Sequence, residues 1–106
     1  MAYSIDHVAA EMMLETEELK EILIAFFEDA PKLIEKGIQA AQTGDRLQLS
    51  RSMHSLKGAA LNMRMDKLGE LANRAETGGG VSLQTLQEIQ AEYERMEIVF
   101  HEYFSR

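Results

Sequence analysis

The chain has no cysteine and no tryptophan, and it contains a single proline, Pro31. Without cysteine it has no disulfide framework and no thiolate to act as a nucleophile or metal ligand. Aromatic residues make up only 7% of the sequence, whereas hydrophobic residues of all kinds make up 45%. The core must therefore consist mainly of leucine, methionine and alanine, a mixture that favours packed helices over a sheet.

Positive charge is also scarce. Eleven Lys and Arg residues against 18 Asp and Glu residues give a net charge of −7, and the cations form no cluster of the kind that nucleic acid binding requires.

No apolar run approaches the roughly 18 residues of a membrane span. The N-terminus lacks the basic start and apolar run of a secretory signal. These absences predict a cytoplasmic location, and the initial methionine favours a free-standing protein.

The length of 106 residues fits a single domain, residues 1–106. Apolar residues recur at helical spacing in five segments, at about residues 5–14, 16–43, 46–63, 66–77 and 82–103. Short connections between long amphipathic helices predict an all-α fold. We expect an antiparallel up-down four-helix bundle in which the short first helix caps one end. Such a bundle closes its own core, so we expect a monomer.

The ends of these segments carry residues that commonly start or stop helices. We expect the N-terminal caps to be Ser4, Thr16, Asp45 (with Gln48 three residues later) and Asp66, and we expect the last helix to start at Ser82. Gly44 and the run Gly78–Gly80 are expected to end helices. Pro31 lies inside the longest apolar pattern, and we expect it to bend that helix near Phe27 without breaking it.

The apolar stripe of each segment predicts the core. The stripes are Ile5, Val8, Ala9, Met12 and Met13; Leu19, Ile22, Leu23, Phe26, Phe27, Ala30, Leu33, Ile34 and Ala41; Leu49, Met53, Leu56, Ala60 and Met63; Leu68, Leu71, Ala72 and Ala75; and Leu83, Leu86, Ile89, Tyr93, Met96, Val99 or Phe100, and Tyr103.

The third segment carries the most informative group of residues. If its 4-3-4-3 apolar stripe faces the core, His54 lies about 140° from the stripe and faces water. Gly58 lies about 180° from the stripe, one turn after His54, and Lys57 flanks the same surface at about 80°. A glycine inside a helix costs about 1 kcal/mol relative to alanine. On the exposed face beside a histidine, it would let another molecule approach. The same residues also fit an ordinary exposed histidine beside a tolerated surface glycine.

The run His54-Ser-Leu-Lys57-Gly58-Ala-Ala resembles the signature of histidine-containing phosphotransfer (HPt) domains. The resemblance continues at Leu68, at the small residue Ala72 and at the pair Ala75-Glu76. One departure is Arg64-Met65, where the family commonly has Gly-Ala, so the turn after this helix is expected to differ in detail. A second is the run Gly78–Gly80, where some members have polar residues near the site.

The resemblance implies a role for each residue around His54. His54 is the phosphorylated residue, Lys57 balances the charge of the phosphoryl group, and Glu76, on the neighbouring helix, orients the ring. Solvated surface charges are the alternative interpretation of Lys57 and Glu76. The expected docking surface contains Arg51, Gly58 and Leu61, the last about 120° from the core stripe. Val8, Met12 and Phe27 are expected to extend it.

The function implied is that of a phosphocarrier. It takes a phosphoryl group from a receiver-domain aspartate and passes it to another receiver in a multistep phosphorelay. Two alternatives stay open: a histidine kinase serves as the direct donor, or the chain is a helical adaptor that binds a receiver without chemistry. The expected partners are response-regulator receivers and hybrid sensor kinases.

Other chemistries lack their residues in this sequence. There is no phosphate-binding glycine loop for ATP and no His-Glu-x-x-His metal motif, and the serines beside His54 have no nucleophile elbow. We therefore expect a stoichiometric carrier and not an enzyme. It should have no cofactor or metal of its own, the Mg²⁺ belonging to the partner receiver. His7 and His101 are interpreted as ordinary surface histidines.

Overall fold

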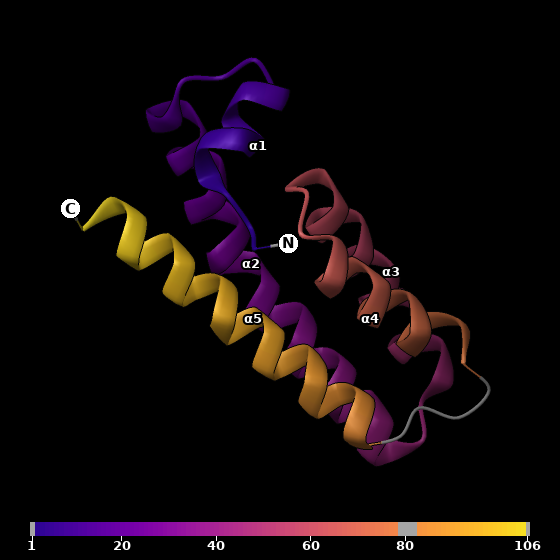
Figure 1. Ribbon diagram of the computed structural model, residues 1–106. Helices are drawn as coiled ribbons and strands as arrows, with labels where there is room; N and C mark the ends of the chain where they lie inside the picture. Colours follow the sequence, from indigo (N-terminus) through magenta and orange to yellow (C-terminus); the bar gives the residue numbers. More distant parts are fainter. Residues whose placement is uncertain (1, 79–82, 106) are drawn as a thin grey trace.

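The computed structural model describes residues 2–78 and 83–105. Within those ranges the chain forms five helices (Figure 1): α1 (Ile5–Glu11), α2 (Thr16–Thr43), α3 (Arg46–Asn62), α4 (Asp66–Thr77) and α5 (Leu83–Phe104). In this part of the chain, no helix has both the length and the apolar character that a membrane crossing needs. The predicted start of the last helix at Ser82, and the glycines at 79 and 80, lie outside the described residues.

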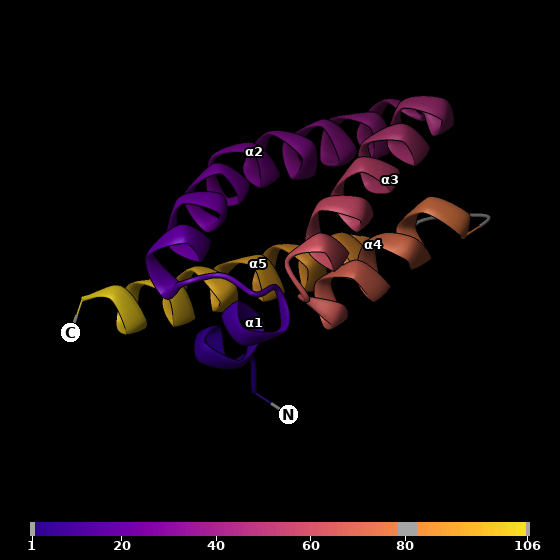
Figure 2. The same cartoon turned by 90° about the horizontal axis from the view of Figure 1, so that it is seen from above.

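The predicted all-α four-helix bundle is confirmed. Helix α2 packs against α3, α3 against α4, α4 against α5, and α5 against α2, which closes the ring. Helices α2 and α5 are long, at 28 and 22 residues, whereas α3 and α4 have 17 and 12. The α3–α4 hairpin therefore covers only part of the long pair, and α1 lies beyond its turn (Figures 1 and 2).

Helix α1 is fastened to the bundle by its apolar face and by two tyrosines. Ile5 and Val8 are buried in the core. The Tyr3 hydroxyl donates a hydrogen bond to the carbonyl oxygen of Met63 at 2.6 Å, and the Tyr103 hydroxyl donates one to the Asp6 carboxylate. Burial raises the pKa of Tyr3 to about 12, so its phenol keeps the proton that it donates.

Helix α2 continues through Pro31 and follows a curved path (Figure 2). Proline has no amide hydrogen, so the carbonyl of Phe27, four residues earlier, loses its helical donor. The hydroxyl of Tyr93 on α5 donates to that carbonyl oxygen at 3.0 Å. Burial and the nearby Glu97 carboxylate raise the pKa of Tyr93 to about 12, which keeps this donor protonated. The expected continuity of the helix is confirmed.

Three helices end in the left-handed conformation, with φ of 58° at Met13, 73° at Gly44 and 61° at Arg64. In each case the next amide donates to a carbonyl five residues back, the pattern that closes a helix end. The predicted end at Gly44 is confirmed. The first helix was expected to reach Leu14 but ends at Glu11, because Met13 turns the chain without a glycine. Arg64 likewise takes a conformation that favours glycine.

Two predicted N-terminal caps are confirmed and two are wrong. The side chains of Ser4 and Asp45 accept hydrogen bonds from the amides three residues later. Thr16 is the first residue of α2 and not its cap, because the Glu18 carboxylate reaches back to the amide of Glu15. Asp66 is the first residue of α4, where its charge favours the helix N-terminus without capping it.

The predicted core stripes of α3 and α4 are buried along their whole length. Three of the residues expected in the other stripes are exposed: Met13, Ile22 and Leu83. Met13 lies in the turn that ends α1. Ile22 lies in the first half of α2, in the part that extends past the α3–α4 hairpin (Figure 1). Leu83 lies at the first residue of α5, where the bundle ends.

Candidate functional site

The buried stripe of α3 determines where His54 points. Leu49, Met53, Leu56 and Ala60 face the core, and Met63 is buried just after the helix. The imidazole of His54 therefore projects from the opposite side, and 68% of its side chain is exposed. The predicted orientation is confirmed.

Glu76 reaches His54 from the neighbouring helix. Leu68, Ala72 and Ala75 bury one face of α4 against the bundle, which brings the last turn of α4 alongside the middle of α3. Oε2 of Glu76 lies 2.8 Å from Nδ1 of His54, and only 17% of the Glu76 side chain is exposed. The two residues are 22 positions apart in sequence.

The second carboxylate oxygen of Glu76 is also occupied. Nζ of Lys57 lies 2.7 Å from Oε1 of Glu76, and it also donates to Oδ1 of Asn73 at 3.3 Å. His54, Glu76, Lys57 and Asn73 thus form one chain of polar contacts across α3 and α4. Asn73 was not predicted from the sequence. Its position three residues before Glu76, on the same side of α4, was the available signal.

This environment keeps Glu76 ionised. The hydrogen bond from Lys57 lowers the pKa of the carboxyl group most strongly, burial opposes the shift, and the hydrogen bond with His54 lowers the pKa further. An ionised carboxylate can only accept hydrogen bonds. In a neutral imidazole, Nδ1 must therefore carry the proton and Nε2 must hold the lone pair.

Open space surrounds Gly58, one turn beyond His54. A Cβ atom added there would have none of the described atoms within 4 Å, outside its own turn of helix. The fold therefore does not need a glycine at this position. No side chain projects from α3 at this position, so a partner can come close to the helix backbone next to His54.

The other predicted docking residues divide into exposed and buried ones. Arg51 is exposed on α3. Leu61 is 45% exposed, and its side chain rests on α4, where a Cβ at Gly69 would lie 2.5 Å from Cδ2 of Leu61. The expectation that Val8 belongs to this surface is wrong, because Val8 lies on the buried face of α1. Met12 and Phe27 are partly buried and pack against the core.

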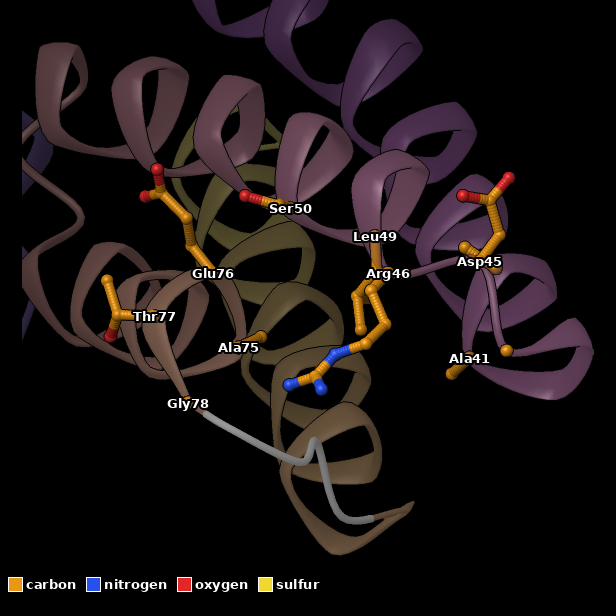
Figure 3. A pocket seen from close by; sticks show the side chains of 11 residues that line it. Ala41, Asp45, Arg46, Leu49, Ser50, Ala75, Glu76, Thr77 and Gly78 are labelled. Atoms are coloured by element: carbon orange, nitrogen blue, oxygen red, sulfur yellow. The ribbon is translucent and has the colours of Figure 1, made fainter.

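A cavity of about 510 Å³ lies beside the site, between the α2–α3 turn and the last turn of α4 (Figure 3). Arg46, Leu49 and Ser50 line it from α3, and Glu76 and Thr77 line it from α4. In Figure 3 the Glu76 carboxylate points toward α3, and the Arg46 guanidinium extends toward Gly78. The cavity therefore adjoins Glu76, but His54 does not line it.

The other two histidines have different surroundings. Nε2 of His7 lies 3.7 Å from Glu11 on the exposed side of α1, and the His101 ring packs edge-on against Phe100. Within residues 2–78 and 83–105, His, Cys, Asp and Glu side chains nowhere form a group of three or more that could hold a metal ion.

Comparison with known proteins places this site in a family. No curated protein and no solved structure matches the chain. The family model of the Hpt domain matches residues 21–98, which include α3, α4 and every residue of the polar chain around His54. Because the match covers most of the sequence, the chain belongs to the Hpt domain family, whose members carry out phosphotransfer in two-component phosphorelays.

Proposed function

We propose that the chain is a phosphocarrier that accepts a phosphoryl group on Nε2 of His54 from a receiver aspartate and passes it to another receiver. The observation that carries this proposal is the contact between Nδ1 of the exposed His54 and the ionised Glu76. That contact leaves Nε2 with its lone pair available for attack. Members of the family are phosphocarriers rather than enzymes, which agrees with this role.

The transfer step balances without a separate base. The Nε2 lone pair attacks the phosphorus of the aspartyl phosphate, and the bond between phosphorus and the aspartate oxygen breaks. The aspartate leaves as a carboxylate with the bonding electron pair. Because Nδ1 keeps its proton, the ring becomes positively charged as the N–P bond forms. The Glu76 carboxylate, 2.8 Å away, stabilises that developing charge.

Lys57 completes the charge balance of the site. A bare carboxylate beside the ring would repel the incoming phosphoryl group, whose negative charge spreads over three oxygens. Nζ of Lys57, 2.7 Å from Glu76, offsets that carboxylate and leaves the site close to neutral. Asn73 holds Lys57 on this side of α3 through its amide oxygen. Lys57 therefore acts both on Glu76 and on the charge of the phosphoryl group.

The partner supplies the remaining components. The receiver contributes the Mg²⁺ ion and the aspartate that gives or takes the phosphoryl group, and the Hpt chain contributes the histidine and its positioning residues. In this proposal the chain has no use for ATP, and each molecule carries one phosphoryl group at a time. Gly58, Arg51 and Leu61 form the surface against which the receiver closes.

The test is phosphotransfer from a panel of phosphorylated receivers to the wild-type chain and to its His54→Gln variant. We expect an acid-labile phosphoryl group, detected by intact mass, on the wild type only. Labelling by a histidine kinase but by no receiver would favour direct service by a kinase. If neither donor class labels the wild type, the chain is an adaptor and the proposal is wrong.

A further inference from the structure

A second cavity, of about 690 Å³, lies between α1, the turn that joins α3 to α4, and α5. Lys67, in the first turn of α4, lines this cavity, whereas Glu76 belongs to the last turn of the same helix. The apolar part of the cavity wall consists of the buried side chains of Val8, Met65 and Met96. The volume is within the range of sites that hold small organic molecules.

Glu92 brings a buried charge to this cavity. Only 5% of the residue is exposed, and among the described residues it is the one acidic or basic residue that is buried. It follows Ile89 by three positions and precedes Met96 by four, so it lies on the core-facing side of α5. A carboxylate loses its hydration when it is buried. The packing of α5 therefore gives no reason for a glutamate at this position.

The Glu92 carboxylate has ion-pair partners but lacks a hydrogen bond at one oxygen. Nη1 of Arg95 lies 3.3 Å and Nζ of Lys67 lies 3.8 Å from Oε1 of Glu92, yet no group in the described ranges donates a hydrogen bond to this oxygen. Buried acceptors in folded proteins nearly always have a donor. The side chains of Lys67 and Arg95 are 61% and 59% exposed, so they can move aside without disturbing the core. A ligand that displaces Lys67 can therefore donate to Oε1.

Glu92 and Arg95 present opposite charges within a few ångströms of each other. The ammonium and carboxylate of an α-amino acid are attached to the same carbon, so the two charges of such a ligand are similarly close. An ammonium donates hydrogen bonds and accepts none, which suits Glu92. A carboxylate can form paired hydrogen bonds with a guanidinium, which suits Arg95. Arg64 also lines the cavity, and Nη1 of Arg64 donates to a neutral group, the carbonyl oxygen of Asn62, at 3.0 Å.

The charges of the cavity wall favour a ligand that carries both signs. Besides His7, the wall has three basic and three acidic residues: Arg64, Lys67 and Arg95, and Glu11, Asp66 and Glu92. A simple anion meets the three carboxylates, and a simple amine meets the three cations. A zwitterion has no net charge, so neither set repels it as a whole.

We propose that this cavity binds a free α-amino acid with an apolar side chain. The ligand ammonium donates to Glu92 and takes the place of the Lys67 ammonium. The ligand carboxylate lies against the guanidinium groups of Arg95 and Arg64, and the ligand side chain packs on the apolar wall. The end of a peptide supplies only one of the two charges, so the site fits a free amino acid. This inference does not depend on the proposed phosphotransfer.

The first experiment tests the ligand class. Nitrogen-15-labelled protein is titrated with leucine, methionine and phenylalanine while its backbone amide resonances are followed by NMR spectroscopy. The controls are the amine and the acid that correspond to each amino acid, which for leucine are isopentylamine and isocaproate. We expect at least one amino acid to shift the resonances of the cavity residues to saturation. Its dissociation constant should be at least about tenfold lower than that of its amine or its acid.

The second experiment assigns the contacts with matched variants. Glu92→Gln should weaken binding at least about tenfold, whereas Glu94→Gln, at an exposed position of the same helix, should leave it unchanged. Arg95→Gln should weaken binding to a similar degree. Its control is Arg74→Gln, because the Arg74 side chain is 58% exposed and also pairs with a glutamate. Lys67→Ala removes the cation that competes with the ligand ammonium, so it should bind at least as tightly as the wild type. Circular dichroism checks that each variant is folded.

Four results would overturn the inference. The first is the absence of saturable shifts with all three amino acids. The second is equal affinity for the amine or the acid, because one charge would then suffice. The third is wild-type affinity in both Glu92→Gln and Arg95→Gln, and the fourth is weaker binding by Lys67→Ala. Each would leave the proposed function intact, because phosphotransfer to His54 is measured separately.

Discussion

Oε2 of Glu76 and Nδ1 of His54 lie 2.8 Å apart, although the residues belong to different helices and are 22 positions apart in sequence. The contact depends on the antiparallel packing of α3 and α4, because each helix buries its own apolar face against the bundle. It selects the ring form whose Nε2 is free to react. In the proposed function, the bundle thus positions its nucleophile on the surface without enclosing it.

Removing the Glu76 carboxylate should slow phosphotransfer without preventing it. A hydrogen bond to a charged group contributes about 1.5 kcal/mol, which corresponds to roughly a tenfold change in rate. We expect Glu76→Ala to show that loss. Glu76→Gln should lie between Ala and the wild type, because its amide oxygen can still accept from Nδ1 of His54. Single-turnover transfer rates from one receiver provide the measurement, and equal rates for all three proteins would contradict the role of Glu76.

The stability of the protein should depend on the charge of Glu76. Its pKa in the folded state lies below its ordinary value of 4.5, mainly because of the hydrogen bond from Lys57. The associated stabilisation is therefore fully present above pH 4.5 and is lost as the pH falls through the folded-state pKa. We expect the wild type to exceed Glu76→Gln by about 1 kcal/mol in unfolding free energy at pH 7. Urea denaturation of both proteins should show a smaller difference in unfolding free energy at pH 3 than at pH 7.

Gly58 should be replaceable in the fold but not in transfer. Because the space around it is open, Gly58→Ala should raise the unfolding free energy by about 1 kcal/mol through better helix propensity. Gly58→Gln should also fold at least as well as the wild type, but its side chain would hold the partner away from His54. We expect transfer by this variant to fall at least about tenfold. A Gly58→Gln protein with wild-type transfer would show that no partner approaches there.

Tyr93 should matter to stability because Pro31 lies in α2. Tyr93→Phe leaves the Phe27 carbonyl without its donor, and we expect a loss of about 1–2 kcal/mol. In a Pro31→Ala background, the amide of residue 31 can bond that carbonyl instead, so the same tyrosine substitution should cost less. Chemical denaturation of the four proteins in this cycle measures the difference. Additive effects would mean that the two residues act independently.

Periodicity in the sequence was enough to predict the buried stripe of α3 and the exposure of His54. The helix ends at Met13 and Arg64 were not predictable in the same way, because the left-handed conformation there occurs without glycine. The hydrogen bond from Tyr93 to Phe27 joins residues 66 positions apart. It depends on how α2 and α5 pack and not on any local pattern.

The site itself was predicted unevenly. Glu76 was found through resemblance to a family, and the structure brings its carboxylate to the predicted ring. Asn73 was missed because its one signal in the sequence, a position three residues before Glu76, is weak until Lys57 is seen to contact it. Val8 was assigned to the wrong surface, since the period of a seven-residue helix does not say which part of the bundle it covers.

The most direct test of the account is to locate the phosphoryl group on the ring. Nitrogen-15-labelled protein would be phosphorylated with the small-molecule donor phosphoramidate, and its histidine ring nitrogens followed by NMR spectroscopy. We predict that the phosphoryl group occupies Nε2 of His54 and that the unmodified ring carries its proton on Nδ1. Phosphorylation at Nδ1, or on His7 or His101 in preference to His54, would contradict the account.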